Sequence, residues 1–254
     1  MQPIGFFRHD HVFCEAKIYS EFYSHDQPEY INSVTSLFIS WIGIFGIINN
    51  KRATNDILGL YTSFIVNGIC SCAYHFTHYI GWGLADRMSM IVISIYCCNI
   101  FIRVFTVSNV SGLFIHFIRL IFTSYILILL VCAGLHNESQ FNTLFGAFLV
   151  SLVMFVRFIH TVHGRHELAN RGLAYMISAG VLWIVTEGLC KQYWIMKYLL
   201  GHAMWHIGIS LGGYFISVAA ISILIDNIKI DYRYGIPFTI LRHQIVTSEN
   251  KFEI

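Results

Sequence analysis

Three histidines are the residues of this sequence best suited to bind a metal. His202 and His206 are four residues apart, so on a helix their imidazoles project from the same face. His75 belongs to a different apolar segment, far away in the sequence. Three imidazoles suit Zn²⁺, and a three-ligand set leaves the fourth tetrahedral position open, as in catalytic zinc sites. The sequence therefore predicts a catalytic three-histidine zinc site.

Two further polar residues accompany these histidines. Ser71 precedes His75 by one helical turn and shares its face. Asp86 follows His75 by eleven residues, next to the following apolar segment. Zinc lowers the pKa of a bound water to about 7, and Asp86 is placed to take the proton of that water and pass it to a leaving group. Ser71 would steady a developing oxyanion or orient the water. This set of residues predicts hydrolysis of an amide or ester.

The elements that must hold these residues are long apolar segments. Of 254 residues, 56% are hydrophobic and only 12% are charged, whereas an ordinary soluble domain has about 25% charged residues. A membrane-spanning helix needs about 20 mostly apolar residues. The predicted spans are residues 33–49, 57–80, 87–107, 112–134, 141–161, 172–190 and 201–225, with one break at Gly81-Trp82-Gly83. The predicted fold class is therefore all-α, a seven-transmembrane helix bundle.

The basic residues predict how this bundle crosses the membrane. With seven spans, 11 of the 16 Lys and Arg residues fall on the face of the C-terminus and the other five on the opposite face. Basic residues favour the cytoplasmic side, so we expect a cytoplasmic C-terminus and a lumenal or extracellular N-terminus. The predicted organisation is an N-terminal lumenal segment (1–32), a catalytic transmembrane domain (33–225) and a cytoplasmic tail (226–254). In this topology all five site residues reach a similar depth near the outer side, and a lipid substrate would enter sideways between helices.

The remaining charged and histidine clusters are assigned no catalytic or metal-binding role. The net charge of +2 is spread over loops and tails, so nucleic-acid binding is not expected. No obligatory protein partner is evident either. His160, His163 and His166 lie beside Arg157 and Arg165. We interpret them as a solvated loop or a contact with lipid headgroups, rather than as a second metal site.

The cysteines predict one covalent link. Five of the seven cysteines fall inside predicted spans, whereas Cys14 and Cys190 map to the outer boundary. A secretory lumen is oxidising, so we expect a disulfide between Cys14 and Cys190 that ties the N-terminal segment to the end of the sixth span.

The order of these motifs resembles a known superfamily. The pattern consists of Ser-x3-His, an Asp eleven residues later and a late His-x3-His, all within seven predicted spans. It resembles the pattern of the superfamily that includes alkaline ceramidases, adiponectin-type receptors and Per1-like lipid-remodelling hydrolases. The amino-acid sequences of residues 68–77 and 201–206 most resemble those of alkaline ceramidases, and the resemblance extends from Val12 to about Ile225.

The resemblance to alkaline ceramidases implies roles for the site residues. His75, His202 and His206 would bind zinc, Asp86 would be the proton-transfer acid and base, and Ser71 would stabilise the oxyanion. The reaction implied is hydrolysis of ceramide to a sphingoid base and a fatty acid, with the acyl chain in a pocket of the bundle. We expect a multi-pass protein of the ER or Golgi membrane.

The sequence departs from this family near the N-terminus. Alkaline ceramidases bind Ca²⁺ there through an acidic motif. Here Glu15 and Glu29 remain, but Val12 stands in place of an Asp and Lys17 in place of an Asn. Because Ca²⁺ takes six to eight oxygen ligands and an ammonium is a poor neighbour, we expect calcium binding to be weak or absent. Our hypothesis is that Lys17 takes over the structural role of calcium by pairing with Glu15 and Glu29.

Three alternative functions remain open from the sequence. A hydrolase of glycerolipid or GPI-anchor acyl chains, as in the Per1-like relatives, would have a similar site. An adiponectin-type receptor is disfavoured, because those proteins carry a sizeable N-terminal soluble segment and have the opposite orientation. A transporter or channel is disfavoured because the ionisable residues inside the spans cluster at one end and form no continuous relay.

Overall fold

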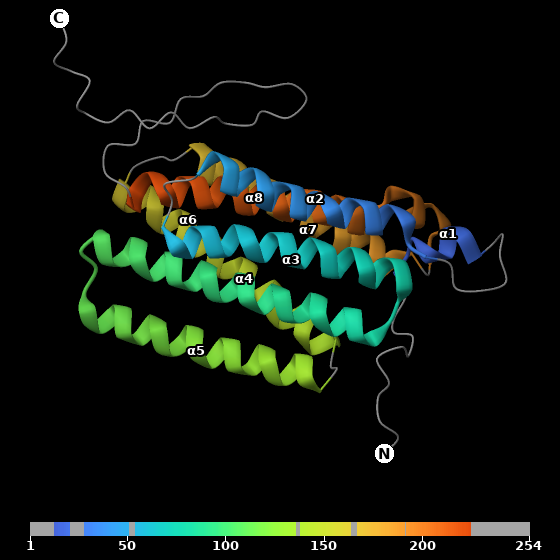
Figure 1. Cartoon of the computed structure of the whole chain (residues 1–254), viewed down its shortest axis with the longest axis horizontal. Coiled ribbons are helices and arrows are strands. Elements are labelled where there is room, and N and C mark those ends of the chain that lie inside the picture. The colour runs from blue at the N-terminus through green and yellow to red at the C-terminus, as the bar shows by residue number, and fades with distance from the viewer. Residues whose placement is uncertain are drawn as a thin grey trace, which may run out of the picture.

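The computed structural model describes residues 13–20, 28–50, 54–135, 138–163, 167–190 and 192–224. Most of these residues form long helices that lie side by side (Figure 1). Residues 226–254, the predicted tail, lie outside the described part of the chain. In chain order the elements are α1 (Ala16–Ser20), α2 (Tyr30–Asn49), α3 (Asn55–Thr77), α4 (Ile80–Val107), α5 (Gly112–Gly134), α6 (Glu138–His163), α7 (Glu167–Leu189), the 3₁₀ helix η1 (Trp194–Leu199) and α8 (Gly201–Leu224).

Seven helices of the described residues are long and apolar enough to cross a membrane. They correspond one to one with the predicted spans, so the predicted seven-helix membrane fold is confirmed. Large apolar side chains are exposed along their outer faces, as expected where lipid replaces water. Of the seven spans, α5 is the most exposed, since only 11% of its apolar stretch is buried within the protein.

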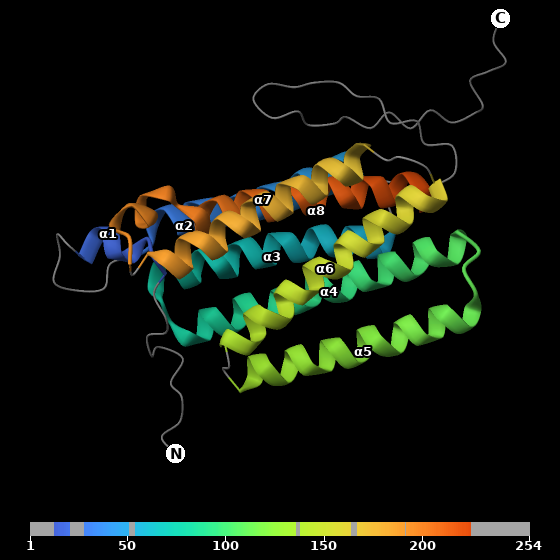
Figure 2. The ribbon, with the colours of Figure 1, turned by 180° about the vertical axis from the view of Figure 1, so that it is seen from behind.

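Close pairs of helices build the bundle. α7 packs along α8, α2 packs along α3, and α2 also contacts α8. At the α7–α8 crossing, a Cβ on Gly212 would lie 2.7 Å from the Gly172 carbonyl oxygen, so only glycine allows this approach. Small residues commonly permit such contacts between membrane helices. Figure 2 shows α6 crossing α4 obliquely, with α5 at the edge of the bundle.

The turn between α3 and α4 differs from the prediction. We expected the break at Gly81-Trp82-Gly83, but α4 already begins at Ile80. The chain reverses at His78, which adopts a left-handed conformation (φ 53°) at the end of α3. Gly83 is instead a packing position, where a Cβ would lie 2.8 Å from the Tyr74 ring. As a result Asp86 lies within the second turn of α4, close to the end of α3.

Cys14 and Cys190 form a disulfide, with their Cα atoms 6.2 Å apart. The bond fastens the segment that leads into α1 to the residue that follows α7, as predicted. The Cys14 N–H also donates a hydrogen bond to Glu187 Oε2 at 3.0 Å. Two contacts therefore hold the N-terminal segment on the end of α7.

Removing this disulfide is expected to lower the thermal stability of the protein. A disulfide typically contributes about 2–4 kcal/mol by restricting the unfolded chain. The Cys14→Ser/Cys190→Ser variant should therefore melt at a lower temperature than the wild type in the same detergent. Cys72→Ser, which removes a free, half-buried thiol, is the control. Equal melting temperatures for all three proteins would show that the link is not structural.

Candidate metal centre

His75, His202 and His206 come together at one end of the bundle. His75 lies in the last turn of α3, and the other two lie in the first two turns of α8. One ring nitrogen from each lies within 4.8 Å of the others, and all three side chains are buried. The described residues thus contain a buried three-histidine group that can hold a metal ion.

The start of α8 explains how two of these histidines reach the site. The chain leaves η1 through Leu200, which is left-handed (φ 51°). Gly201 then lies directly against α7, where a Cβ would clash with Thr186 and lie 2.8 Å from the Leu182 carbonyl oxygen. A side chain at position 201 would push α8 away from α7 and displace His202 with it.

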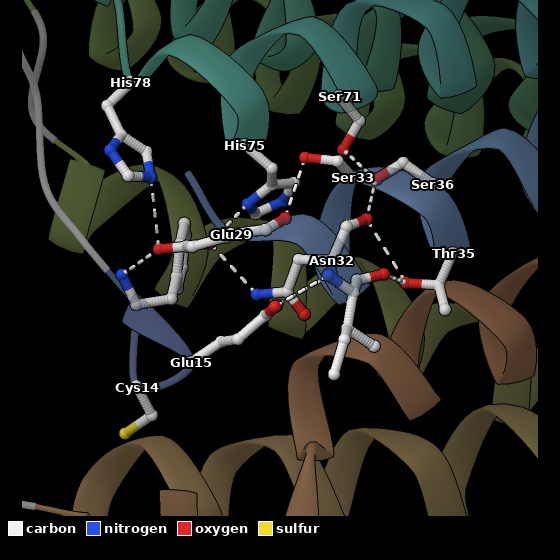
Figure 3. Close-up of polar contacts among 12 residues, drawn as sticks. Cys14, Glu15, Glu29, Asn32, Ser33, Thr35, Ser36, Ser71, His75 and His78 are labelled. Carbon is white, nitrogen blue, oxygen red and sulfur yellow. Dashed lines mark hydrogen bonds and ion pairs between the residues drawn. The ribbon is translucent and has the colours of Figure 1, made fainter. Parts of the chain in front are cut away.

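Glu29 orients His75. Its Oε2 lies 2.6 Å from His75 Nδ1, and neither side chain is open to solvent. Figure 3 shows the two side chains side by side, with a dashed line for this contact. An ionised carboxylate can only accept a hydrogen bond, so Nδ1 carries the proton and Nε2 is left with a lone pair. Metal-binding histidines usually donate their second nitrogen to such a carboxylate. Glu29 is therefore placed as a metal-site carboxylate would be, where it can orient His75 for metal binding.

His206 is held in the same way. Its Nδ1 lies 3.1 Å from Thr35 Oγ1 and 3.3 Å from Ser36 Oγ. The hydroxyl proton of Thr35 is already directed at the Ile31 carbonyl oxygen, 2.8 Å away, so Thr35 accepts from the imidazole. The first two turns of α2 thereby leave His206 Nε2 available to a metal.

The Glu29 carboxylate is surrounded by donors from several elements. Besides His75, it accepts the Phe13 N–H at 2.6 Å and the Asn32 amide at 3.0 Å, and His78 Nε2 lies 3.5 Å away. Burial alone would raise the pKa of Glu29, but the hydrogen bonds from His75 and Asn32, together with the nearby His78, outweigh it, so the pKa lies well below its ordinary value. Glu29 is therefore ionised at neutral pH.

The N-terminal segment covers the three histidines. The Phe13 ring packs against His202, with ring centroids 4.1 Å apart, and against His75 at 5.2 Å. Glu15, also buried, accepts the N–H groups of Ile31 and Asn32 at 2.6 and 2.7 Å. These are unsatisfied donors at the start of α2, so Glu15 caps that helix.

Ser71 and Asp86 line the same pocket as the three histidines. Asn67, Ser71 and His75 follow one another at intervals of four residues, so they form one stripe along α3. The Asn67 amide donates to Asp86 Oδ1 at 2.8 Å and so holds the carboxylate from the neighbouring helix. The structure therefore brings all five predicted site residues to one pocket.

The pocket extends from the histidines deep into the bundle. Its lining follows α8 from His202 to Ala220 and includes Phe101 of α4 and Phe155 of α6. At 1.5 Å per residue, the stretch from His206 to Ala220 is about 21 Å long. The empty space is about 1260 Å³, its open mouth included. Apart from the polar groups near the histidines, the lining is mostly apolar.

A second, much smaller hollow adjoins the metal centre. Its lining includes Glu15, Asn32, Glu187, Lys197 and His202, and the Lys197 side chain is buried.

The ammonium of Lys17 lies nearby, 3.2 Å from Cys190 Sγ. Cys14, Glu187 and Cys190 also cluster, but both sulfurs are in the disulfide and neither is a thiolate that could bind a metal.

Sequence reasoning missed four contributors to this region. Asn67 had a detectable signal, because it precedes Ser71 by one helical turn. The sequence indicates Glu29 only as part of a vestigial calcium site or as a partner of Lys17, and it offers Phe13 only as a backbone carbonyl in that calcium site. Lys197 had no local signal, because its burial depends on how η1 packs.

Comparison with known proteins agrees with this geometry. The family model described as Ceramidase matches residues 10–235, which is most of the chain. The chain belongs to the ceramidase family. No curated protein matches it significantly. Membership makes the chain a ceramidase-type amide hydrolase with a lipid substrate in the membrane, and the three-histidine group and its pocket are the part of this family member suited to such chemistry.

Glu29→Gln is expected to weaken zinc binding without unfolding the bundle. Loss of a hydrogen-bonded partner of a ligand typically costs about 10–100-fold in metal affinity. The affinity would be measured by competition with a chromogenic zinc chelator.

Glu15→Gln is the matched control for this experiment. Glu15 is also buried near the N-terminus, and its carboxylate accepts the backbone N–H groups of Ile31 and Asn32 in α2. Similar zinc affinities for the Glu29 and Glu15 variants would contradict the role of Glu29.

Proposed function

We propose that this protein is a zinc-dependent ceramidase that hydrolyses the amide bond of ceramide within the membrane. The observation that carries the proposal is the position of the three histidines, Ser71 and Asp86 at one end of a long apolar pocket. Membership of the ceramidase family supports the reaction class. A sphingoid base and a fatty acid would be the products.

The donor set fits zinc. Three buried imidazoles converge, and the hydrogen bonds of His75 and His206 direct their Nε2 atoms away from Glu29 and Thr35. Three neutral imidazoles suit Zn²⁺ and leave a position open. A zinc ion held there would acidify a water molecule and polarise the amide carbonyl.

The residues around the histidines would complete the reaction. Asp86 takes a proton from the attacking water and passes it to the leaving nitrogen, while Asn67 keeps its carboxylate in place. Water oxygen joins the carbonyl carbon, the C–N bond breaks, and the transferred proton leaves with the amine. Ser71 donates a hydrogen bond to the oxygen on which negative charge develops.

The shape and lining of the pocket favour a lipid with a long acyl chain as the substrate. Its apolar length of about 21 Å along α8 matches an extended chain better than a small soluble amide. The phenylalanines of α4 and α6 that line it offer an apolar surface, which favours burial of hydrocarbon.

The proposal predicts zinc-dependent release of sphingoid base from a panel of ceramides. Purified protein in detergent would be assayed at neutral and alkaline pH, with and without a zinc chelator. His206→Ala should abolish release and lower the zinc content. Asp86→Asn should retain zinc but lower kcat by about 10²–10⁴-fold, the usual contribution of a general acid and base.

His116→Ala, at an exposed position on α5, is the control for histidine removal and should match the wild type. A folded, zinc-loaded protein that releases no sphingoid base would refute the ceramidase proposal and direct the assay to glycerolipid esters.

We also propose that calcium is not required. Glu15 and Glu29 are engaged by N–H donors, and Lys197 lines the same hollow as Glu15. Asn32 Oδ1 is buried without a donor among the described residues, whereas Ca²⁺ takes six to eight oxygen ligands. Lys17, in our hypothesis, offsets the charge of Glu15 and Glu29 in place of calcium.

Removal of calcium, with free zinc held constant, should therefore leave the melting temperature and the sphingoid-base release unchanged. Lys17→Met should lower the melting temperature, because in our hypothesis it removes the positive charge that offsets Glu15 and Glu29. Arg171→Met, which removes an exposed cation paired with Glu167, is the control. Activity that is lost in calcium chelator and restored by Ca²⁺ would overturn the proposal.

We propose that the histidine end of the bundle faces the lumen of the ER or Golgi. The charge bias of the loops supports this orientation. The Cys14–Cys190 disulfide lies at that end, and such bonds form in oxidising compartments.

A further inference from the structure

The pocket wall contains a hydrogen-bond donor that no protein acceptor satisfies. Trp183 of α7 lines the pocket. Its Nε1 is buried and has no hydrogen-bond partner among the described residues. An indole nitrogen can only donate, and a buried donor without an acceptor is unfavourable. Such a donor in a pocket wall indicates that a ligand supplies the acceptor.

The Trp183 ring is held in a defined orientation beside the metal centre. It stacks on Trp205, with centroids 5.2 Å apart and an interplanar angle of 23°. It also stands nearly perpendicular to the His202 ring, at 82° and 5.4 Å. Trp183 is therefore close to a metal ligand, and its position is set by packing on two side chains of α8.

The reactive residues enter the pocket from other helices. Ser71 belongs to α3 and Asp86 to α4, which pack against each other, whereas α7 packs mainly along α8. In the proposed reaction Ser71 serves the carbonyl oxygen and Asp86 serves the leaving nitrogen. The acceptors of a ceramide that remain are the hydroxyl groups of its sphingoid base, which lie within a few bonds of that nitrogen.

We propose that Trp183 determines specificity for the head of the substrate, by donating a hydrogen bond from its indole N–H to a hydroxyl oxygen of the sphingoid base. This inference rests on the proposed function. It names a contact that selects N-acyl lipids with a hydroxylated base over N-acyl amines with a plain alkyl chain.

Trp183→Phe, which keeps an aromatic ring but removes the donor, tests the proposal. The substrates are ceramide, its analogues without the C1 or the C3 hydroxyl, and an N-acyl alkylamine without either. The loss of one neutral hydrogen bond lowers a binding or rate constant by about 2- to 12-fold, so kcat/KM for ceramide should fall by that factor. The analogue that lacks the bonded hydroxyl should show no further loss in the variant, which identifies that hydroxyl.

A binding measurement keeps this test separate from the proposed function. The affinity of the zinc-free protein for a free sphingoid base should fall by the same factor in the variant, and this result does not depend on turnover. A wild type that binds the base but releases none from ceramide would refute the ceramidase proposal and leave the contact of Trp183 supported.

Trp194→Phe, at an exposed position on η1, is the control and should match the wild type. Replacing Trp183 by 3-benzothienylalanine preserves the ring shape without the N–H and guards against misfolding of the Phe variant. Equal losses on all four lipids, or unchanged affinity and kcat/KM in the isosteric variant, would overturn the proposal.

Discussion

The Glu29 carboxylate is the group on which the histidine end of this bundle depends. A buried charge is very unfavourable unless it is paired and hydrogen-bonded. Glu29 meets this requirement with donors from three places: the Phe13 backbone, Asn32 in α2 and His75 in α3. Each donor is therefore held in place by the need to satisfy one charge. The cover of the three histidines, the start of α2 and the orientation of His75 are coupled through it.

Local and compositional patterns predicted the framework well. Seven spans follow from hydropathy, because a bilayer demands a certain length of apolar helix. His202 and His206 follow from helical periodicity, and so does Ser71 before His75. The placement of Asp86 followed from the assumption that its segment returns near the end of α3. The disulfide followed from the boundary positions of its two cysteines.

Interactions between distant segments could not be predicted in the same way. An acidic residue before a helix is compatible with a cap, a cation site or a partner for a histidine, and only packing brings Glu29 to His75. Similarly, Asn67 is an ordinary amide on a helix until Asp86 lies beside it. The break between α3 and α4 was misplaced because glycine is the usual residue for a left-handed turn, whereas His78 adopts that conformation here.

The direction of the long pocket bears on which lipids can use it. The histidines lie at the beginning of α8, and the apolar lining runs along that helix toward its other end. A lipid with its amide at the histidines would point its tail from one surface toward the midplane, as lipids of that leaflet already do. Lipids of that leaflet could thus enter the pocket in the orientation that they already have, whereas lipids of the opposite leaflet would first have to flip across the bilayer. In the proposed function, the supply of substrate would in this way be tied to transbilayer lipid asymmetry.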